Sequence, residues 1–225
     1  MSPARTVSAL PVGDRWFDDG LYTRVTGLAH RSPGWLDTAV SLWSLYGLAL
    51  FALLLAAAWW RARAEDPDRA AHALLAPVAV VAAFAVSSGL KVLLREERPC
   101  RSLPVVTVDA CPALGDWSLP SNHATVAGAA AVALLLIDRR LAALAVPAAL
   151  AMAASRIWIG AHYPHDVVLG LAVGAAVSWA VMRALGPVGL AAQSLRCMMW
   201  RPTKPSVGWR NPSGRVPRIS KPSDS

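Results

Sequence analysis

The segment SRIWIGAHYPHD, residues 155–166, places a cation, histidines and a carboxylate close together in a strongly apolar chain. His162 precedes Asp166 by four residues, and Pro164 stands at a position suited to the first turn of a helix. Asp166 can therefore accept a hydrogen bond from one ring nitrogen of His162 and leave the other nitrogen with a free lone pair. This pairing predicts that His162 is a nucleophile and that Asp166 orients it.

The segment PSNH, residues 120–123, supplies a second set of polar groups. His123 has no carboxylate adjacent to it in the sequence, and we expect it to act as a general acid. Ser121 is of a type favoured as a helix N-cap, and a helix N-terminus offers free backbone N–H groups to a phosphate. Asn122 is expected to add a backbone N–H, and its side-chain amide could add a further donor.

Three cations accompany these residues: Lys91, Arg98 and Arg156. Lys91 and Arg98 are seven residues apart, which is nearly two helical turns, so they share one face of a helix. Phosphate matches such a set, because arginine offers a bidentate fork and lysine a point charge. The residues therefore predict a phosphate site beside His162.

Apolar segments must position these groups. Uncharged runs of 23, 21 and 21 residues occupy 38–60, 70–90 and 117–137, and a helix needs about 20 apolar residues to cross a bilayer. A soluble alanine-rich bundle is the alternative, but its helices would carry a polar stripe. We predict an all-α, polytopic membrane helix bundle with an N-terminal interfacial helix and five transmembrane helices, at roughly 36–60, 71–94, 120–137, 141–160 and 165–185.

These spans bring the polar clusters to one face of the membrane. Taken singly, each residue has a structural explanation, since a histidine at a boundary is usually interfacial and an arginine at a helix end usually extends into water. Ionisable groups within spans cost about 2.5–3.5 kcal/mol at mid-bilayer and less near the ends. The convergence of six such groups at one mouth favours a functional site.

The three motifs resemble the signature of the type 2 phosphatidic acid phosphatase superfamily. KVLLREERP (91–99), PSNH (120–123) and SRIWIGAHYPHD (155–166) match its order and spacing. That pattern is Lys, six residues, Arg-Pro; then Pro-Ser-Gly-His; then Ser-Arg, five residues, His, three residues, Asp. One departure is Asn122, which stands where the pattern most often has glycine; asparagine tolerates unusual backbone angles better than most residues.

The resemblance implies a metal-independent phosphatase without a cofactor. It makes His162 the nucleophile that becomes phosphohistidine, Asp166 its partner and His123 the acid that protonates the leaving group. It also implies that phosphate is bound by Lys91, Arg98, Ser121 and Arg156.

The distribution of basic residues predicts how the bundle is oriented. With five spans, 13 of the 22 Lys and Arg residues fall on the side of the C-terminus and 9 on the other side. The positive-inside rule places the first set in the cytoplasm. We therefore expect a multi-pass cell-membrane protein with its active site on the extracytoplasmic face and its C-terminal tail in the cytoplasm.

The sequence divides into three parts: residues 1–35, 36–200 and 201–225. The first contains no signal-peptide core but an amphipathic pattern typical of a helix on the membrane surface, although a solvated helix is an alternative. The second is the transmembrane phosphatase domain. The third is rich in Pro, Ser and basic residues, and we expect it to be disordered and either drawn to anionic headgroups or simply solvated.

Two cysteines, Cys100 and Cys111, flank the loop predicted to lie outside. An oxidising compartment favours a disulfide between them, and two free loop thiols are the alternative. The loop offers no histidines at ligand spacing, so a metal site is not expected there. Nucleic-acid binding is a poor explanation of the basic charge, because the long basic segment has no fold signal.

The expected substrate is a lipid phosphate or diphosphate held in the bilayer. Polyprenyl diphosphate of the undecaprenyl or decaprenyl type is the leading candidate, because Arg95 and Arg101 could hold a second phosphate. Alternatively, these two arginines neutralise Glu96 and Glu97 or contact lipid headgroups. Phosphatidate or phosphatidylglycerophosphate is the second candidate. A transporter or scaffold with a phosphate pocket is the non-enzymatic alternative, and the spans argue against a soluble haloperoxidase.

Overall fold

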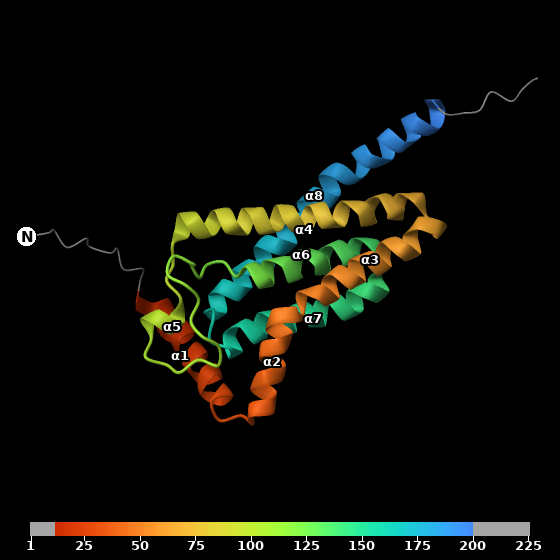
Figure 1. Ribbon diagram of the computed structural model, residues 1–225. Helices are drawn as coiled ribbons and strands as arrows, with labels where there is room; N and C mark the ends of the chain where they lie inside the picture. Colours follow the sequence, from red (N-terminus) through yellow and green to blue (C-terminus); the bar gives the residue numbers. More distant parts are fainter. Residues whose placement is uncertain (1–11, 200–225) are drawn as a thin grey trace, which may run out of the picture.

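The computed structural model describes residues 12–199, except for the side chains of residues 12–17, 65 and 187–199. The predicted disordered tail, 201–225, lies outside the described residues. Within 12–199 the chain is helical and contains no β-strand. The helices in Figure 1 are α1 (Val12–Ala29), α2 (Gly34–Tyr46), α3 (Leu48–Glu65), α4 (Pro67–Leu94), α5 (Pro99–Ser102), α6 (Asn122–Ile137), α7 (Arg139–Trp158) and α8 (Pro164–Met199).

Three segments are long and apolar enough to cross a membrane: Pro67–Ser102, Arg139–Trp158 and Pro164–Gly186. A fourth span results if α2 and the following Leu48–Ala64 are counted together, although they are bent by 49°. α6 is apolar but has only 16 residues. The predicted polytopic helical bundle is confirmed, and the predicted span 120–137 corresponds to this shorter helix.

The predicted span 36–60 is divided into α2 and α3 at Gly47. A Cβ atom at this position would collide with the carbonyl oxygen of Trp43 and lie 2.8 Å from the side chain of Met152 on α7. The absence of a side chain at Gly47 therefore allows α7 to pack closely against the junction of α2 and α3.

Aspartates define two helix starts at the same end of the bundle. Asp66 caps α4 by accepting hydrogen bonds from the backbone N–H groups of Asp68 and Arg69. Asp138 caps α7 in the same way, through Arg140 and Leu141. Caps of this kind contribute about 1 kcal/mol each.

α6 forms the centre of the bundle and contacts α3, α4, α7 and α8 (Figure 1). Its small residues allow these neighbours to approach closely, and a Cβ at Gly170 of α8 would lie 2.6 Å from the carbonyl oxygen of Ser121. The start of α6 is thereby held against the start of α8, where the predicted site residues lie.

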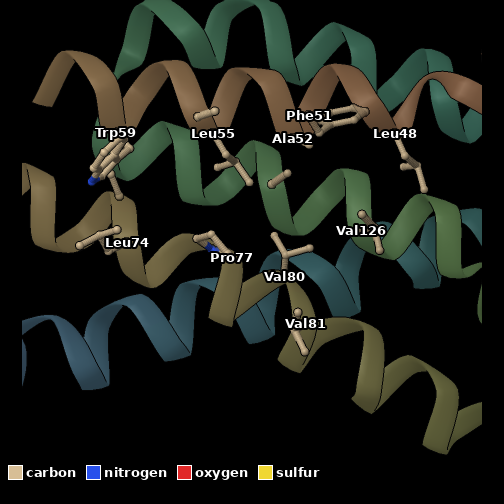
Figure 2. A pocket seen from close by; sticks show the side chains of 13 residues that line it. Leu48, Phe51, Ala52, Leu55, Trp59, Leu74, Pro77, Val80, Val81 and Val126 are labelled. Atoms are coloured by element: carbon tan, nitrogen blue, oxygen red, sulfur yellow. The ribbon is translucent and has the colours of Figure 1, made fainter. Parts of the chain in front are cut away.

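An apolar cavity of about 440 Å³ lies between α3, α4 and α6. Figure 2 shows its lining, which includes Phe51 and Trp59 from α3, Pro77 from α4 and Val126 from α6. Val126 is three residues from His123, so the cavity lies one helical turn deeper in the bundle than the start of α6.

The predicted N-terminal helix is present as α1 and packs against α7 and α8. Tyr22 is fully buried and donates a hydrogen bond of 3.0 Å to the carbonyl of Gly160. On α1, Leu21 and Leu28 are exposed, while Val25 is half-buried. The placement of α1 on a membrane surface stays a prediction.

Candidate active site

The predicted site residues lie at one end of the bundle, on different elements. Arg98 follows α4, Ser121 to His123 begin α6, Arg156 stands in the last turn of α7, and His162 and Asp166 flank the start of α8. In Figure 1 this is the end where α5 and the loop before α6 lie, opposite the turn between α3 and α4. Side-chain contacts join His162, Asp166, Arg98 and Lys91 into one cluster.

His162 and Asp166 form a buried pair. Nδ1 of His162 lies 3.2 Å from Oδ2 of Asp166, while Nε2 lies 3.2 Å from Nη1 of Arg98. An ionised carboxylate only accepts and a guanidinium only donates, so the proton belongs on Nδ1 and the lone pair on Nε2. Burial lowers the pKa of His162 to about 3, although the hydrogen bond with Asp166 opposes this shift. The ring is therefore neutral.

Three donors converge on Oδ2 of Asp166. Besides His162, the hydroxyl of Ser118 and the backbone N–H of Tyr163, at 2.8 Å, donate to this oxygen. Ser118 is fully buried and was not predicted from the sequence. Its position in the loop, two residues before Pro120, gave no sign of a contact with a residue 48 positions away.

Arg98 and Lys91 are buried and held by the loop that precedes α6. They do not share a helix face as predicted, because α4 ends at Leu94 and Arg98 has an extended backbone before α5. Arg98 donates from Nε to the carbonyl of Asp116 at 2.9 Å and from Nη1 to the carbonyl of Ala161 at 2.8 Å. Lys91 donates to the carbonyl of Trp117 at 2.6 Å. These backbone acceptors hold both cationic side chains in place.

Asp116 places a carboxylate between the two cations. Its Oδ1 lies 3.0 Å from Nη2 of Arg98 and 3.7 Å from Nζ of Lys91. Burial opposes ionisation, but the hydrogen bond from Arg98 and the charges of Arg98 and Lys91 hold the pKa of Asp116 below its ordinary value. The carboxylate is half exposed and forms an ion pair with both cations.

Arg156 and His123 line a separate part of the site, facing α2. Both border a cavity of about 500 Å³, together with Asp37 and Ser44 of α2 and Asp109 of the loop. Arg156 donates to the hydroxyl of Ser44 at 2.5 Å, while its Nε is buried without a partner among the described residues. The contribution of α2 was not predicted from the sequence.

Ser121 and Asn122 differ in what their side chains do. Ser121 is the N-cap residue of α6 as predicted, but its hydroxyl makes no capping bond and is buried without a partner in the described part of the chain. Asn122 accepts a hydrogen bond of 2.7 Å from Ser87 of α4, so its amide oxygen faces the core. Ser121 thus keeps a free hydroxyl at the start of α6.

Arg95 and Arg101 are directed to backbone carbonyls. Arg95 is exposed at the left-handed C-cap of α4 and donates to Val92, while Arg101 donates to Pro112. These contacts do not bring them to the His162 cluster. The predicted disulfide between Cys100 and Cys111 is formed, with a Cα–Cα distance of 5.9 Å.

His165 joins α1 to the site and was also not predicted. Its Nδ1 lies 2.6 Å from Oδ2 of Asp18, and its Nε2 lies 3.0 Å from Glu96 and 3.2 Å from Oδ1 of Asp166. The ligand atoms of Glu96, His165 and Asp166 lie within 4.8 Å of one another, close enough to hold a metal ion. Both ring nitrogens face carboxylates, however, which suits an ion pair, whereas a metal ligand needs a lone pair.

Comparisons with known proteins fit this arrangement. The family model described as PAP2 superfamily matches residues 72–188. Undecaprenyl-diphosphatase BcrC of Bacillus subtilis is 29% identical over 163 residues, which cover 72% of this chain and 81% of that protein. Decaprenylphosphoryl-5-phosphoribose phosphatase of Mycobacterium tuberculosis is 38% identical over 151 residues, which cover 64% and 77%.

Two solved structures share the fold. LpxE of Aquifex aeolicus superposes with a TM-score of 0.60 at 19% identity, covering 77% of this chain and 99% of that one. The PAP2-type phosphatidylglycerolphosphate phosphatase of Bacillus subtilis gives a TM-score of 0.56 at 17% identity, covering 81% and 88%.

The fold and its relatives define a multi-pass membrane phosphatase. The chain belongs to the PAP2 superfamily. The resemblance seen in the three sequence motifs is therefore confirmed.

Proposed function

We propose that this phosphatase removes the terminal phosphate of a polyprenyl-linked lipid through a phosphohistidine at His162, with polyprenyl diphosphate as its leading substrate. The observation that carries the mechanism is the buried pair of His162 and Asp166, with the Nε2 lone pair directed at Arg98. An anion bound by Arg98 would lie in front of this lone pair.

The reaction has two steps. Nε2 of His162 attacks phosphorus, the bond from phosphorus to the lipid oxygen breaks, and His123 gives that oxygen its proton. Water then attacks the phosphohistidine, His123 takes a proton from the water, and cleavage of the phosphorus–nitrogen bond releases inorganic phosphate and restores the lone pair. Asp166 remains ionised and balances the positive charge on the phosphorylated ring.

The phosphate itself would be bound by the three cations and by the start of α6. Arg98, Lys91 and Arg156 neutralise its charge, and the partnerless hydroxyl of Ser121 supplies a donor. The N-terminus of α6 adds backbone N–H groups and a favourable dipole.

A lipid substrate fits the position of the site. The connection between α5 and α6 is too short to form a separate lid domain, and the disulfide ties its first part to α5, so it offers little surface for gripping a large soluble molecule. A lipid keeps its tail in the bilayer, which raises its local concentration at the helix ends. The apolar cavity below Val126 offers part of that tail a place within the bundle.

The names of the two relatives suggest which lipids to compare. One relative is named an undecaprenyl-diphosphatase and the other a decaprenylphosphoryl-5-phosphoribose phosphatase, and the second has the higher sequence identity to this chain, over a slightly shorter match. Both substrates carry a terminal phosphate on a polyprenyl-phosphoryl lipid. The phosphoribose lipid is therefore the second candidate.

The test is phosphate release by the purified protein from a panel of lipids. It contains a polyprenyl diphosphate, decaprenylphosphoryl-5-phosphoribose, phosphatidate, phosphatidylglycerophosphate and a water-soluble ester. We expect the highest kcat/KM for the polyprenyl diphosphate. A clear preference for phosphatidate or phosphatidylglycerophosphate would refute the polyprenyl assignment. Phosphate release from the soluble ester alone would refute the lipid assignment. No release from any member of the panel would favour a transporter or scaffold.

Activity should persist in excess chelator. The phosphate charge is met by Lys91, Arg98 and Arg156, and no step of the mechanism requires a metal. The measurement is the initial rate with and without EDTA. Loss of activity on chelation, restored by Mg²⁺, would contradict this mechanism and point to Glu96, His165 and Asp166 as metal ligands.

Replacing Asp116 by asparagine should tighten inhibition by inorganic phosphate and by vanadate. The carboxylate competes with these anions for Arg98 and Lys91, so its removal should lower Ki about tenfold. Glu97→Gln removes an exposed charge at the same end of the bundle and serves as the control. An unchanged or higher Ki in Asp116→Asn would mean that the carboxylate supports the cations instead of competing for them.

We also propose that the catalytic end faces the outside of the cell. The disulfide between Cys100 and Cys111 fits an oxidising compartment, and the arginine-rich turns α3–α4 and α6–α7 lie together at the other end, joined by an ion pair of 3.1 Å between Arg61 and Asp138. In whole cells, an impermeant maleimide should label Cys100 and Cys111 only after reduction. Labelling that requires permeabilised cells would show the opposite orientation.

A further inference from the structure

A second polar cavity lies at the end of the bundle opposite the catalytic site. It has a volume of about 680 Å³ and is bordered by the end of α3, the start of α4 and the turn from α6 to α7. Four arginines line it: Arg61, Arg69, Arg139 and Arg140. They come from three helices and meet only because the α3–α4 and α6–α7 turns lie side by side.

The cavity carries excess positive charge. Arg61 pairs with Asp138 at 3.1 Å, and Arg69 pairs at 3.4 Å with Asp66, which does not itself line the cavity. Asp138 and Asp66 also cap helices. In each of them Oδ1 accepts hydrogen bonds from backbone N–H groups, and only Oδ2 pairs with an arginine. Arg139 and Arg140 form no ion pair with any carboxylate whose side chain the structure describes, so about two positive charges at this cavity stay unpaired among these residues.

The residues around the cavity are of the types expected where a membrane meets water, at the level of the lipid headgroups. Trp59 and Trp60 lie in the same last turns of α3, and the guanidinium of Arg63 stands 3.3 Å from the ring centroid of Trp60. Tryptophan prefers the membrane–water boundary, and arginine beside it reaches the phosphate layer. Leu135, Leu136 and Ile137 form the apolar wall of the cavity, on the side that faces the spans.

We propose that this cavity binds the phosphate headgroup of an anionic phospholipid from the leaflet opposite the catalytic mouth. The arginines would hold the phosphate oxygens, and the wall from Leu135 to Ile137 would contact the first carbons of the acyl chains. A lipid with two phosphates, such as cardiolipin, matches the two uncompensated charges best. The bound lipid would tie the α3–α4 turn to the α6–α7 turn. This inference does not depend on the proposed substrate.

The experiment measures lipid binding to the purified full-length chain in a neutral detergent. Cardiolipin, phosphatidylglycerol, phosphatidylcholine and inorganic phosphate are titrated separately, and occupancy is measured by native mass spectrometry and by the shift in Tm. We expect the order cardiolipin, phosphatidylglycerol, then phosphatidylcholine, with no saturable binding of phosphate. Phosphate binding as strong as that of the lipids would show a general anion site and overturn the lipid assignment.

Two substitutions locate the site. Each arginine near a headgroup contributes roughly 1 kcal/mol, so Arg61→Gln and Arg140→Gln should each weaken cardiolipin binding about fivefold, and the double variant about 30-fold. The backbone N–H of Arg140, and not its side chain, donates to Asp138, so Arg140→Gln leaves the helix cap at Asp138 in place. Arg31→Gln, an exposed arginine outside this cavity, is the control. Equal affinities in Arg140→Gln and Arg31→Gln would overturn the proposal.

Discussion

His162→Ala should lower kcat by on the order of 10⁵–10⁶-fold, the loss typical of removing a nucleophile that acts with its base as one unit. The side chain supplies the attacking Nε2 lone pair, and no other described histidine combines burial with a carboxylate on one nitrogen and Arg98 on the other. The control is His30→Ala, which removes an exposed histidine directly after α1.

A trapping experiment distinguishes the roles of the two site histidines. Enzyme quenched in alkaline SDS should carry a phosphate on His162 that is stable in base and labile in acid, and none should form in His162→Ala. His123→Ala should still form the phosphoenzyme but turn over about 10²–10⁴-fold more slowly, because general-acid assistance is lost. Turnover by His162→Ala, or phosphate found on His123, would refute the assigned mechanism.

Asp166→Ala should lower kcat by about 10⁴-fold, and Asp166→Asn by only about 10²-fold. Ser118, Tyr163 and His162 all donate to Oδ2, so the amide oxygen of asparagine should take that position and keep the ring orientation. What asparagine lacks is the negative charge that stabilises the phosphorylated ring. Alanine loses both the charge and the orientation.

The ratio of the two variants is the informative quantity. Removing Ser118 as well, in Ser118→Ala/Asp166→Asn, should allow the amide to turn and bring kcat toward the alanine value. Asp68→Asn, at the exposed start of α4, is the control for a lost carboxylate. Equal rates for Asp166→Asn and Asp166→Ala would contradict the role of the three donors, and full activity in both would contradict an orienting role.

The contact between His162 and Asp166 was predictable, because Asp166 stands in the first turn of α8 and His162 directly before that helix. The common helix face predicted for Lys91 and Arg98 was wrong, because α4 ends at Leu94 and a left-handed Arg95 follows it. Ser121 was expected at the start of a helix and occupies the N-cap of α6.

The residues that the sequence did not reveal reach the site from distant segments. Asp116 and Ser118 lie in an irregular loop, Ser44 on α2, and Asp18 on α1, 147 residues from its partner His165. No periodicity links such pairs, because loop conformation and helix packing decide which of them meet. The division of span 36–60 was missed for a similar reason, since it depends on how Met152 packs against Gly47.

The close contact between α6 and α8 has a consequence for how the membrane acts on the reaction. Asp166 accepts a hydrogen bond from His162 through its side chain and another, of 3.0 Å, from the backbone N–H of Ser121 through its backbone carbonyl. Gly170 packs directly against the backbone of Ser121, with no side chain between the two helices. The ring of His162 and the start of α6 are therefore held rigidly together. Changes in bilayer thickness should alter how often a lipid reaches the site, while the rate of phosphoryl transfer to a bound lipid stays nearly constant.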